Sequence, residues 1–401
     1  MPAARHEVVF LSAVRTGFGA FGGALKDLTA TDLGTHAARE ALARSGLPAA
    51  QVDHVIVGNA LQTSADAIYL ARHVALRAGC RIETPAVTVN RLCGSGFEAV
   101  IEGARQILLG ESKVVLCGGA ESMSQAPHVA RGARWGYRFG QTPALEDTLW
   151  EALRDPQCGL AMAETAEALA VEHGITRADC DAYALRSQQG AAKAWADGRM
   201  ADEVIPVPLR DRKSKQETPW ADDEHRRPDT TLAGLAKLPP VFKKEGVVTA
   251  GNASGISDGA AMLVLAHADV AKAAGLKPLG RLVSWGLAGV DPGRMGIGPV
   301  PATRIALADA RLALDAMDRI EINEAFAAQY LAVERTLGLD RAKTNVEGGA
   351  IALGHPLAAS GARLTTHLLH ALRRRQQTLG LGAACIGGGQ GAAVVLEAFP
   401  S

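Results

Sequence analysis

Apolar and polar positions alternate along the chain with two periods, one typical of strands and one typical of helices. Short apolar runs predict strands at Glu7–Ala13, Asp53–Val57, Thr84–Val89 and Gly280–Leu287. Apolar residues three or four positions apart predict helices at Asp32–Ser45, Ser95–Leu109 and Ala302–Leu314. We expect Thr31 to cap the first of these helices and Gly46 to end it. Strands that alternate with helices in this way indicate an α/β fold.

This pattern occurs twice in the chain. Asp53–Ala60 resembles Asp318–Ala325, and these two segments define the offset of an internal repeat. Two further pairs keep the same offset, namely Ala41–Ala43 with Ala306–Ala308 and Ser95-Gly96 with Ser360-Gly361. Three matches at one offset predict a duplicated α/β unit.

A long insertion separates the last strand of the first copy from the rest of that copy. If Cys117 is aligned with Cys385 and Gly259 with Gly391, a short turn joins the two points in the second copy and a long stretch of chain joins them in the first. The predicted parts are a first core half (residues 1–120 plus 249–270), an inserted domain (121–248) and a second core half (271–401). Within the insertion we expect helices at Met162–His173 and Arg177–Asp197 and a solvated loop at Arg210–Asp229. Such an insertion is a natural lid over a large, partly anionic ligand.

Composition excludes several classes of protein. Of the 401 residues, 48% are hydrophobic and 21% are charged, which is typical of a globular protein. Lys and Arg number 42, as do Asp and Glu, so no overall field would attract nucleic acid or a membrane surface. The six cysteines show no Cys-x-x-Cys spacing, which indicates free thiols in a reducing compartment. Because no apolar signal core precedes the first strand, we expect a cytoplasmic protein, or one of the mitochondrial matrix if the source is eukaryotic.

The stretch Gly17–Gly22 contains the spacing Gly-x-Gly-x-x-Gly, which occurs in dinucleotide-binding sites. Its context argues against such a site. No helix begins directly after the glycines, and no second strand ends in an acidic residue at the expected distance.

Three separate segments carry the side chains best suited to chemistry. Cys93 follows a strand and precedes a helix, where backbone amides and the helix dipole favour a thiolate and lower the thiol pKa, although a lone cysteine is as often a buried structural thiol. His355 lies between a glycine and a proline, which directs its ring off a turn. Cys385 precedes a run of glycines that would let the backbone approach a ligand. Asn323 ends a buried strand, at the edge where open α/β sheets place their ligands.

Five motifs resemble those of the thiolase family, and in particular of the 3-ketoacyl-CoA thiolases of fatty-acid β-oxidation. The motifs are Asn90–Gly96, Gly118–Met123, Asn323–Phe326, Gly354–Pro356 and Cys385–Gly389. Related condensing enzymes keep the first cysteine but usually replace the second with histidine or asparagine. The resemblance covers the chain from about Glu7 to Ala398. It implies the thiolase fold, an α/β architecture in which duplicated βαβ-type core domains are stacked as αβαβα layers and carry an inserted loop domain.

The resemblance also implies a role for each residue of the site. Cys93 would carry the acyl group after His355 has taken its proton, and Cys385 would move a proton at the α-carbon of acetyl-CoA. One oxyanion site would use His355 with a water held by Asn323, and the other would use the backbone amides of Cys93 and Gly387. Cleavage or formation of a carbon–carbon bond beside a thioester requires these kinds of group. The reaction implied is reversible, CoA-dependent thiolysis of 3-ketoacyl-CoA by a ping-pong mechanism.

Coenzyme A is implied as a co-substrate, together with acyl-CoA, and no permanent cofactor or metal is implied. The implied contacts are Ser254 and Ala250 along the pantetheine, Phe242 and Met162 near the thiol arm, Met295 beside the acyl pocket and Arg227 near the adenine nucleotide. The family also implies a homodimer or homotetramer. The chain departs from the family pattern at Ala161, where acetoacetyl-CoA-forming thiolases have histidine, and at Ala358, where glycine is usual.

Three alternative functions are open. An acetyl-CoA C-acetyltransferase would act mainly on acetoacetyl-CoA, and Ala161 argues against it. A decarboxylating ketoacyl synthase would not need Cys385, because decarboxylation creates the carbanion without an acid or base at the α-carbon. A non-catalytic acyl-CoA-binding scaffold would not need Cys93, His355 and Cys385 together. The motifs leave acyl chain length and reaction direction open.

Overall fold

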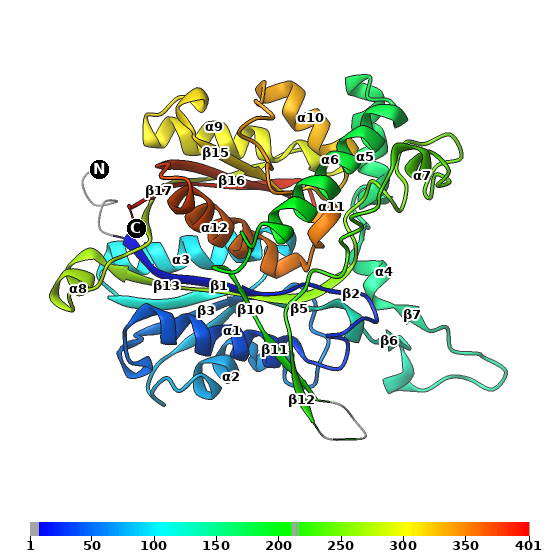
Figure 1. The fold of residues 1–401 in the computed structure, drawn as a ribbon. Coiled ribbons are helices and arrows are strands. Elements are labelled where there is room, and N and C mark those ends of the chain that lie inside the picture. The colour runs from blue at the N-terminus through cyan, green and yellow to red at the C-terminus, as the bar shows by residue number, and fades with distance from the viewer. Residues whose placement is uncertain (1–7, 211–213, 215, 401) are drawn as a thin grey trace.

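Five layers make up the computed structural model, which describes residues 8–210, 214 and 216–400 (Figure 1). One continuous series of paired strands forms two sheet layers, described below as two sheets, and these alternate with three layers of helices, so the predicted αβαβα architecture is confirmed. The start of the first predicted strand lies outside the described residues, as does the N-terminal segment from which the compartment was predicted. So do four residues of the predicted polar loop, Asp211, Arg212, Lys213 and Lys215.

The first sheet has the strand order β4-β3-β5-β13-β1. Its strands are β4 (Ala86–Val89), β3 (His54–Gly58), β5 (Val114–Ser122), β13 (Ser257–His267) and β1 (Val8–Thr16). The first three run parallel, whereas β13 is antiparallel to both β5 and β1. Two short strands, β2 (Gly19–Ala20) and β10 (Val204–Ile205), pair with β13 and β1.

The second sheet repeats this order and these directions. Its strands are β15 (Arg319–Ile322), β16 (Leu379–Ile386), β17 (Gln390–Ala398) and β14 (Gly280–Gly289). A bridge between Ile320 and Thr344 takes the place that β4 has in the first sheet. β1 and β14 also pair: Val9 lies opposite Arg281, and Phe10 lies opposite Gly280. Backbone hydrogen bonds therefore join the two sheets. The predicted duplication is therefore confirmed.

The register of the sheets corrects one detail of the predicted repeat. β3 pairs with β5, and β15 with β16, in registers that both keep the offset between Asp53 and Asp318. The counterpart of Cys385 is therefore Ala120, and the alignment of Cys385 with Cys117 was wrong. That alignment followed a local Cys-x-Gly similarity, which short glycine-rich strand ends can share in more than one register.

Helices cover both faces of each sheet (Figure 1). α1 (Ala30–Ser45) and α2 (Leu70–Arg77) cover the outer face of the first sheet, and α9 (Pro299–Ala310) and α10 (Ala327–Leu337) that of the second. α3 (Ser95–Leu109) and α12 (Leu357–Arg374) form the middle layer and pack against both sheets. The shorter helices are α8 (Ala268–Ala273), α11 (Ala350–Leu353) and the 3-10 turns η2 (Ala49–Gln51), η3 (Ala67–Tyr69), η6 (Ala133–Trp135), η7 (Pro292–Ile297) and η8 (Leu314–Ala316). Among the described helices none is long and apolar enough to cross a membrane.

The two middle helices approach each other closely at equivalent glycines. A Cβ atom at Gly96 would lie 2.4 Å from the amide nitrogen of Ala362, and one at Gly361 would lie 2.4 Å from the amide nitrogen of Phe97. Only glycine permits this approach. The crossing brings the first turns of α3 and α12 together, so the segments that precede the two helices meet as well.

Two helices of the core differ from the prediction at their ends. The N-cap of α1 is Thr29 and not Thr31, because the Thr29 hydroxyl accepts a hydrogen bond from the Asp32 amide at 3.0 Å and the Asp32 carboxylate accepts one from the Thr29 amide at 3.2 Å. α9 begins at Pro299, since a proline in the first turn needs no amide donor. It ends before Arg311, which adopts a left-handed φ of 57°.

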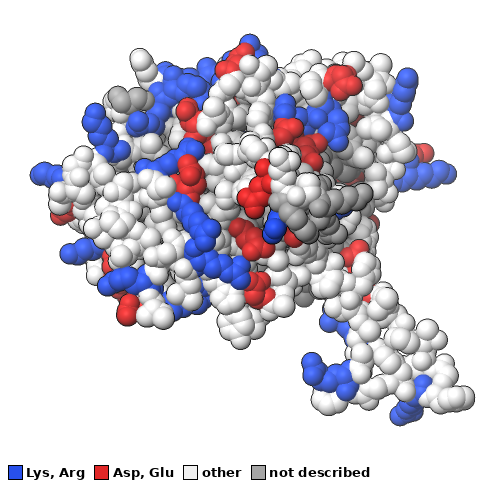
Figure 2. Space-filling view, turned by 60° about the horizontal axis from the view of Figure 1, so that its bottom comes forward, with Lys and Arg blue, Asp and Glu red and all other residues white. Residues whose placement is uncertain are grey.

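The insertion contains helices, short strands and a projecting arm. α5 (Met162–His173) confirms a predicted helix, and α6 (Arg177–Ala196) ends one residue before its predicted end. The other elements are η5 (Met123–Gln125), β6 (His128–Val129), β7 (Glu146–Asp147), α4 (Thr148–Ala152), β8 (Arg154–Asp155), β9 (Leu160–Ala161), β11 (Val207–Arg210), β12 (Glu217–Trp220) and α7 (Leu232–Ala236). β6 and β7 pair at the base of the arm, residues 126–147, which extends away from the body (Figures 1 and 2).

The predicted solvated loop Arg210–Asp229 is partly structured and partly buried. β11 and β12 pair as an antiparallel ribbon. Asp223 is 1% exposed and accepts hydrogen bonds from the guanidinium of buried Arg15 at 2.8 and 3.0 Å. Arg15 also donates to Glu203 at 2.7 Å. Buried ion pairs therefore anchor the insertion to β1, and the prediction failed because a charge paired in the core is locally indistinguishable from a solvated one.

Candidate active site

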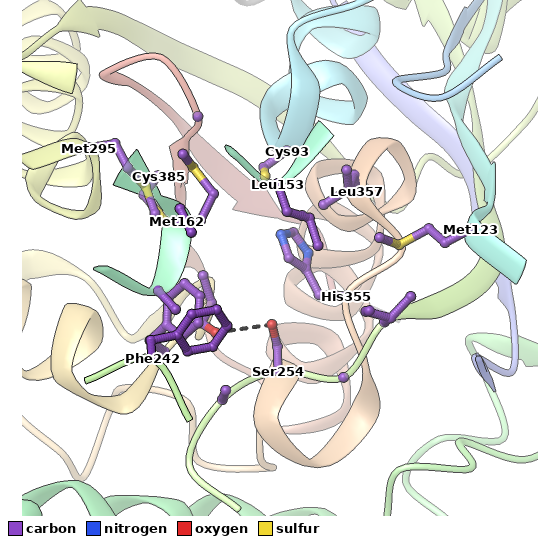
Figure 3. Close-up of a pocket in the computed structure, with 18 of the residues that line it drawn as sticks. Cys93, Met123, Leu153, Met162, Phe242, Ser254, Met295, His355, Leu357 and Cys385 are labelled. Atoms are coloured by element: carbon purple, nitrogen blue, oxygen red, sulfur yellow. Dashed lines mark hydrogen bonds between the residues drawn. The ribbon is translucent and has the colours of Figure 1, made fainter. Parts of the chain in front are cut away.

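A cavity of about 230 Å³ lies where the first turns of α3 and α12 meet the end of β16 (Figure 3). Its lining includes eight residues predicted from the sequence: Cys93, His355, Cys385, Gly387, Met162, Phe242, Ser254 and Met295. Cys93 belongs to the first half of the fold, whereas His355 and Cys385 belong to the second. The cavity therefore depends on both halves.

A strained turn presents Cys93 to the cavity. Cys93 lies in the 3-10 turn η4 (Leu92–Gly94), directly before α3. Leu92 has a left-handed φ of 46°, which is costly for a branched side chain. The Asn90 side chain accepts a hydrogen bond from the Leu92 amide at 2.9 Å, and the Ser95 hydroxyl donates one to the Leu92 carbonyl at 2.7 Å. These bonds hold the conformation that directs the cysteine.

The thiol of Cys93 is not acidic, which corrects the prediction from its place at a helix start. Burial raises its pKa to about 11, and the nearby carboxylate of Glu121 acts in the same direction. The backbone amides of Gly387 and of Cys93 itself hydrogen-bond to the sulfur and offset only part of this effect. Desolvation therefore outweighs the helix terminus, and Cys93 rests as a neutral thiol.

His355 lines the same cavity as the Cys93 thiol, and the partner of its Nδ1 determines which ring nitrogen can accept a proton. Its Nδ1 lies 2.6 Å from the Ser360 hydroxyl, which itself donates to the Pro356 carbonyl at 3.1 Å. Since that hydroxyl has used its proton, Nδ1 must carry the hydrogen and donate it. Burial lowers the pKa of His355 to about 3, and the positive charge of Arg363 adds to the effect. The ring is therefore neutral, and its Nε2 lone pair can act as a base.

Ser360 contacts the imidazole of His355, and the sequence reasoning did not identify it as part of the site. It was noted only as part of the internal repeat, although a hydroxyl five residues after a histidine, in the first turn of the following helix, is a detectable signal. Ser360 is 1% exposed and fixes both the tautomer and the orientation of the ring. Ala358, three positions after His355, is buried in the same turn of α12, where alanine favours the helix more than the usual glycine.

Cys385 is a second neutral thiol. It is the next-to-last residue of β16 and is 1% exposed. Burial raises its pKa above that of Cys93, with a further contribution from the Cys93 thiol itself. The turn that follows requires glycine, since Gly388 and Gly389 have φ of 79° and 81°. This turn carries the Gly387 amide back to the Cys93 sulfur.

Asn323 lies behind His355 and not on the cavity wall. Its side-chain amide nitrogen lies 3.3 Å from Nε2 of His355. Asn323 is fully buried, and its side-chain oxygen has no hydrogen-bond partner among the described residues. The pair offers a polar position next to the imidazole in an otherwise apolar site.

Two predicted CoA contacts lie in a neighbouring cavity of about 380 Å³. Ala250 and Arg227 line it, together with polar side chains such as Gln188 and Thr230. It shares Ala253 and Gly255 with the catalytic cavity, so the two spaces are adjacent. One ligand with an apolar end and a polar end could occupy both.

Comparisons with known proteins agree with these features. The sequence matches the family profile described as "Thiolase, N-terminal domain" over residues 8–269 and "Thiolase, C-terminal domain" over residues 276–398. It is 56% identical to 3-ketoacyl-CoA thiolase, mitochondrial, of Bos taurus over 390 residues, which cover 97% of this chain and 98% of that protein.

Solved structures agree as well. The crystal structure of human mitochondrial 3-ketoacyl-CoA thiolase superimposes with a TM-score of 0.96 at 54% identity and covers 98% of this chain and 99% of that one. The same human protein in complex with CoA superimposes with a TM-score of 0.95 and covers 100% of this chain and 99% of that one. On the family profiles, the relatives and the solved structures together, the chain belongs to the thiolase family.

Proposed function

We propose that the protein is an acetyl-CoA C-acyltransferase that uses CoA to cleave 3-ketoacyl-CoA into acetyl-CoA and a shortened acyl-CoA. One observation carries the proposal: two thiols from different halves of the fold and a neutral imidazole share one apolar cavity. Similarity over nearly the whole chain to 3-ketoacyl-CoA thiolases supports it. The reaction is reversible, so the same site can condense two acyl-CoA molecules.

The first half-reaction makes an acyl-enzyme. The Cys93 sulfur attacks the 3-keto carbon while Nε2 of His355 takes the thiol proton. The bond between the second and third carbons then breaks, and Cys385 gives its proton to the carbanion that leaves as acetyl-CoA. Both thiols start neutral. This suits an order of steps in which Cys93 gives up its proton as it attacks the 3-keto carbon, and Cys385 gives up its proton as the carbon–carbon bond breaks.

The second half-reaction returns the enzyme to its starting state. The thiol of CoA gives its proton to the Cys385 thiolate and attacks the acyl group on Cys93. His355 returns its proton to the Cys93 sulfur as the thioester bond to the enzyme breaks. Atoms and charges balance over the two halves, and the mechanism is ping-pong.

Two groups of donors support the negative oxygens of these steps. The amides of Cys93 and Gly387 already point at the Cys93 sulfur, so they lie close to a carbonyl carried by that atom. Protonated His355, with a water held by Asn323, would serve the thioester oxygen of the acetyl-CoA unit. Removal of one such donor costs about a hundred- to a thousand-fold in rate.

CoA is proposed as a co-substrate, without a resident cofactor or metal. Ser254, Phe242, Met162 and Met295 line the catalytic cavity, and the cavity with Ala250 and Arg227 adjoins it. The pantetheine would follow the first group, and the nucleotide would approach Arg227. The human relative solved in complex with CoA supports this assignment. Ala161 lines the cavity where a histidine would mark an acetoacetyl-CoA enzyme, which favours longer substrates.

Separate assays of the two cysteines test the mechanism. Cys385→Ser should still transfer an acyl group from acyl-CoA to Cys93 but should lose thiolysis, because a serine hydroxyl is too weak an acid; the expected loss is about a hundred- to ten-thousand-fold. Cys93→Ser should lose both reactions. Intact-protein mass and CoA release measure the two steps. If Cys385→Ser exchanges the methyl protons of acetyl-CoA with deuterated solvent at the wild-type rate, the role given to Cys385 is wrong.

A homodimer or homotetramer is the proposed assembly. β4 is an edge strand, and apolar side chains near it are exposed, among them Ile68, Ile82 and Val87. The arm also exposes Trp135 and Phe139. Such surfaces are typical of contacts between subunits. Sedimentation that finds only a 41.7 kDa species at micromolar concentration would exclude this assembly. The compartment, cytoplasm or mitochondrial matrix, stays a prediction that cell fractionation can test.

A further inference from the structure

The imidazole of His225 fills the space beside two glycines near the catalytic base. His225 lies in a turn of the insertion, within the segment Arg210–Asp229 that the sequence predicted to be a solvated loop. A Cβ atom at Gly255 would overlap its ring, and one at Gly354 would lie 3.0 Å from its Cδ2 atom. Gly255 lines the catalytic cavity, and Gly354 directly precedes His355. The ring therefore packs on two backbone segments of the site at once.

Hydrogen bonds join the two segments that this ring contacts. The His355 amide donates to the Ser257 hydroxyl at 3.0 Å and to the Gly255 carbonyl at 3.3 Å. The ring of His225 bonds to the same segment, since its Nε2 lies 3.1 Å from the Ile256 carbonyl. A carbonyl only accepts, so Nε2 carries the ring hydrogen. Burial lowers the pKa of His225, which keeps the ring neutral at neutral pH and fixes this tautomer.

The turn that carries His225 is itself held by the core. Two residues before it, Asp223 pairs with the guanidinium of Arg15 at 2.8 Å, and both side chains are fully buried. Between them in the turn, the Glu224 carboxylate accepts a hydrogen bond from the Ala20 amide at 2.7 Å. Because the core holds both preceding residues, the ring of His225 has a fixed place from which it can hold other backbone.

We propose that His225 is a positioning residue that holds the turn of His355 in place through its contact with Gly354 and its hydrogen bond to Ile256. The inference rests on the thiolase function proposed above, in which His355 takes the proton of Cys93. Proton transfer requires donor and acceptor within hydrogen-bond reach. A displacement of about 1 Å can lower a rate by about a hundredfold. Since the two glycines have no side chains to fill the space, loss of the ring would leave room for the turn to move.

Substrates with and without the nucleotide test this role, because His225 also lines the neighbouring cavity. Thiolysis of acetoacetyl-CoA by CoA is compared with thiolysis of acetoacetyl-pantetheine by pantetheine, which share the reacting groups. His225→Ala should lower kcat by about tenfold in both assays. His225→Phe fills the same space without the Nε2 hydrogen, so it should fold even if His225→Ala does not, and should lower kcat by about threefold in both.

Two results of these assays would overturn the proposal. One is a change in KM with the CoA substrates alone, which would make His225 a contact of the nucleotide. The other is a wild-type kcat in His225→Phe.

His370→Ala is the matched control. His370 is another partly buried histidine whose Nε2 bonds to a backbone carbonyl, that of Ala13 at 2.9 Å, and it is not among the described residues that line either cavity. This variant should keep the wild-type kcat in both assays. Equal losses in His370→Ala and His225→Ala would reduce the effect to a general destabilisation and would contradict a role through His355.

Alkylation of Cys93 by iodoacetamide, followed by the mass of its peptide, tests the same contact without an acyl substrate. His225→Ala should slow the alkylation by about tenfold. In a His355→Asn background the same change should have no further effect, because the residue that it positions is gone. Losses that multiply would refute the proposal. A wild type that is alkylated at Cys93 but does not cleave 3-ketoacyl-CoA would refute the proposed function and leave this test intact.

Discussion

The two halves of the molecule share one backbone plan but carry different side chains at corresponding positions. At the offset of the internal repeat, Cys93 corresponds to Ala358, Cys385 to Ala120 and His355 to Asn90. Each pair has one reactive member and one that packs or shapes a turn. Asn90, for example, holds the strained Leu92 amide, whereas His355 can accept a proton. The duplication therefore supplied two similar frames, and the chemistry arose where the frames differ.

The largest effect is expected when His355 in the second half is replaced by the side chain of its counterpart in the first half, Asn90. His355→Asn should lower kcat/KM for thiolysis by about a hundred- to ten-thousand-fold, because an amide cannot take the Cys93 proton. Steady-state thiolysis measures the loss. His267→Asn is the control, since it replaces the N-cap of α8 by another good capping residue and should leave kcat/KM unchanged. Wild-type activity in His355→Asn would exclude the imidazole as the base.

Equivalent changes at the helix crossing test whether the two frames also match in stability. Gly96→Ala and Gly361→Ala should each lower the free energy of unfolding by about 2 kcal/mol, because each new methyl group meets a backbone amide that cannot move aside. Urea unfolding measures both variants.

Gly103→Ala on α3 is the control for the crossing. Its methyl group would meet the Val115 side chain at 3.1 Å, which can adjust, so the change should stay within about 1 kcal/mol. A loss in only one of the two crossing variants would contradict the equivalence.

The hydrogen bond between His355 and Ser360 is a smaller difference between the two halves. Ser360→Ala should lower kcat by roughly tenfold with little change in KM, because it leaves the buried Nδ1 hydrogen without an acceptor. Ser360→Thr keeps the hydroxyl and should recover most of the rate. An equal loss in both variants would assign Ser360 a packing role alone.

The smallest expected effect concerns His367, where α12 contacts the insertion. The second half of the fold carries no such insertion. Burial alone would lower the pKa of His367, but the carboxylates of Glu203, Glu321 and Glu347 raise it above its usual value. The nearest of them lies 2.8 Å from the ring. Because the folded pKa is raised, this stabilisation is complete below the unfolded pKa near 6.5 and is lost as pH rises through the folded pKa.

The contribution of protonated His367 to the unfolding free energy should therefore decrease as pH rises from about 6 to about 9. The difference in unfolding free energy in urea between the wild type and His367→Gln should shrink over this range. A difference that did not change with pH would contradict the protonated, ion-paired state of His367.

Local sequence patterns predicted the fold better than they predicted the electrostatics. The internal repeat indicated a duplicated α/β unit, and the motifs around Cys93, His355 and Cys385 identified residues that do meet in one cavity. The acidity of Cys93 was mispredicted, because a helix terminus is visible in the sequence whereas the burial that outweighs it depends on the whole fold. The burial of Asp223 was not predicted for the same reason, since its partner Arg15 lies far away in the chain.

Other features require distances that no pattern carries. The lining of the catalytic cavity joins segments from the insertion and from both halves. The true partner of Cys385 in the repeat, Ala120, emerges only from the pairing of the strands. Spacing can identify what is present in a site, but not what surrounds it.

The backbone pairing of β1 with β14 has a mechanical consequence. Any opening of one half against the other would break those hydrogen bonds and slide α3 over α12 at a glycine contact with no spare room. These contacts therefore oppose a hinge opening between the two halves. We therefore expect Cys93 and Cys385 to keep the same separation from one turnover to the next, and the core that holds them to adjust little to the bound substrate. Accommodation of different substrates must come from side chains and from the insertion, which are the parts that selection can retune without disturbing the reaction.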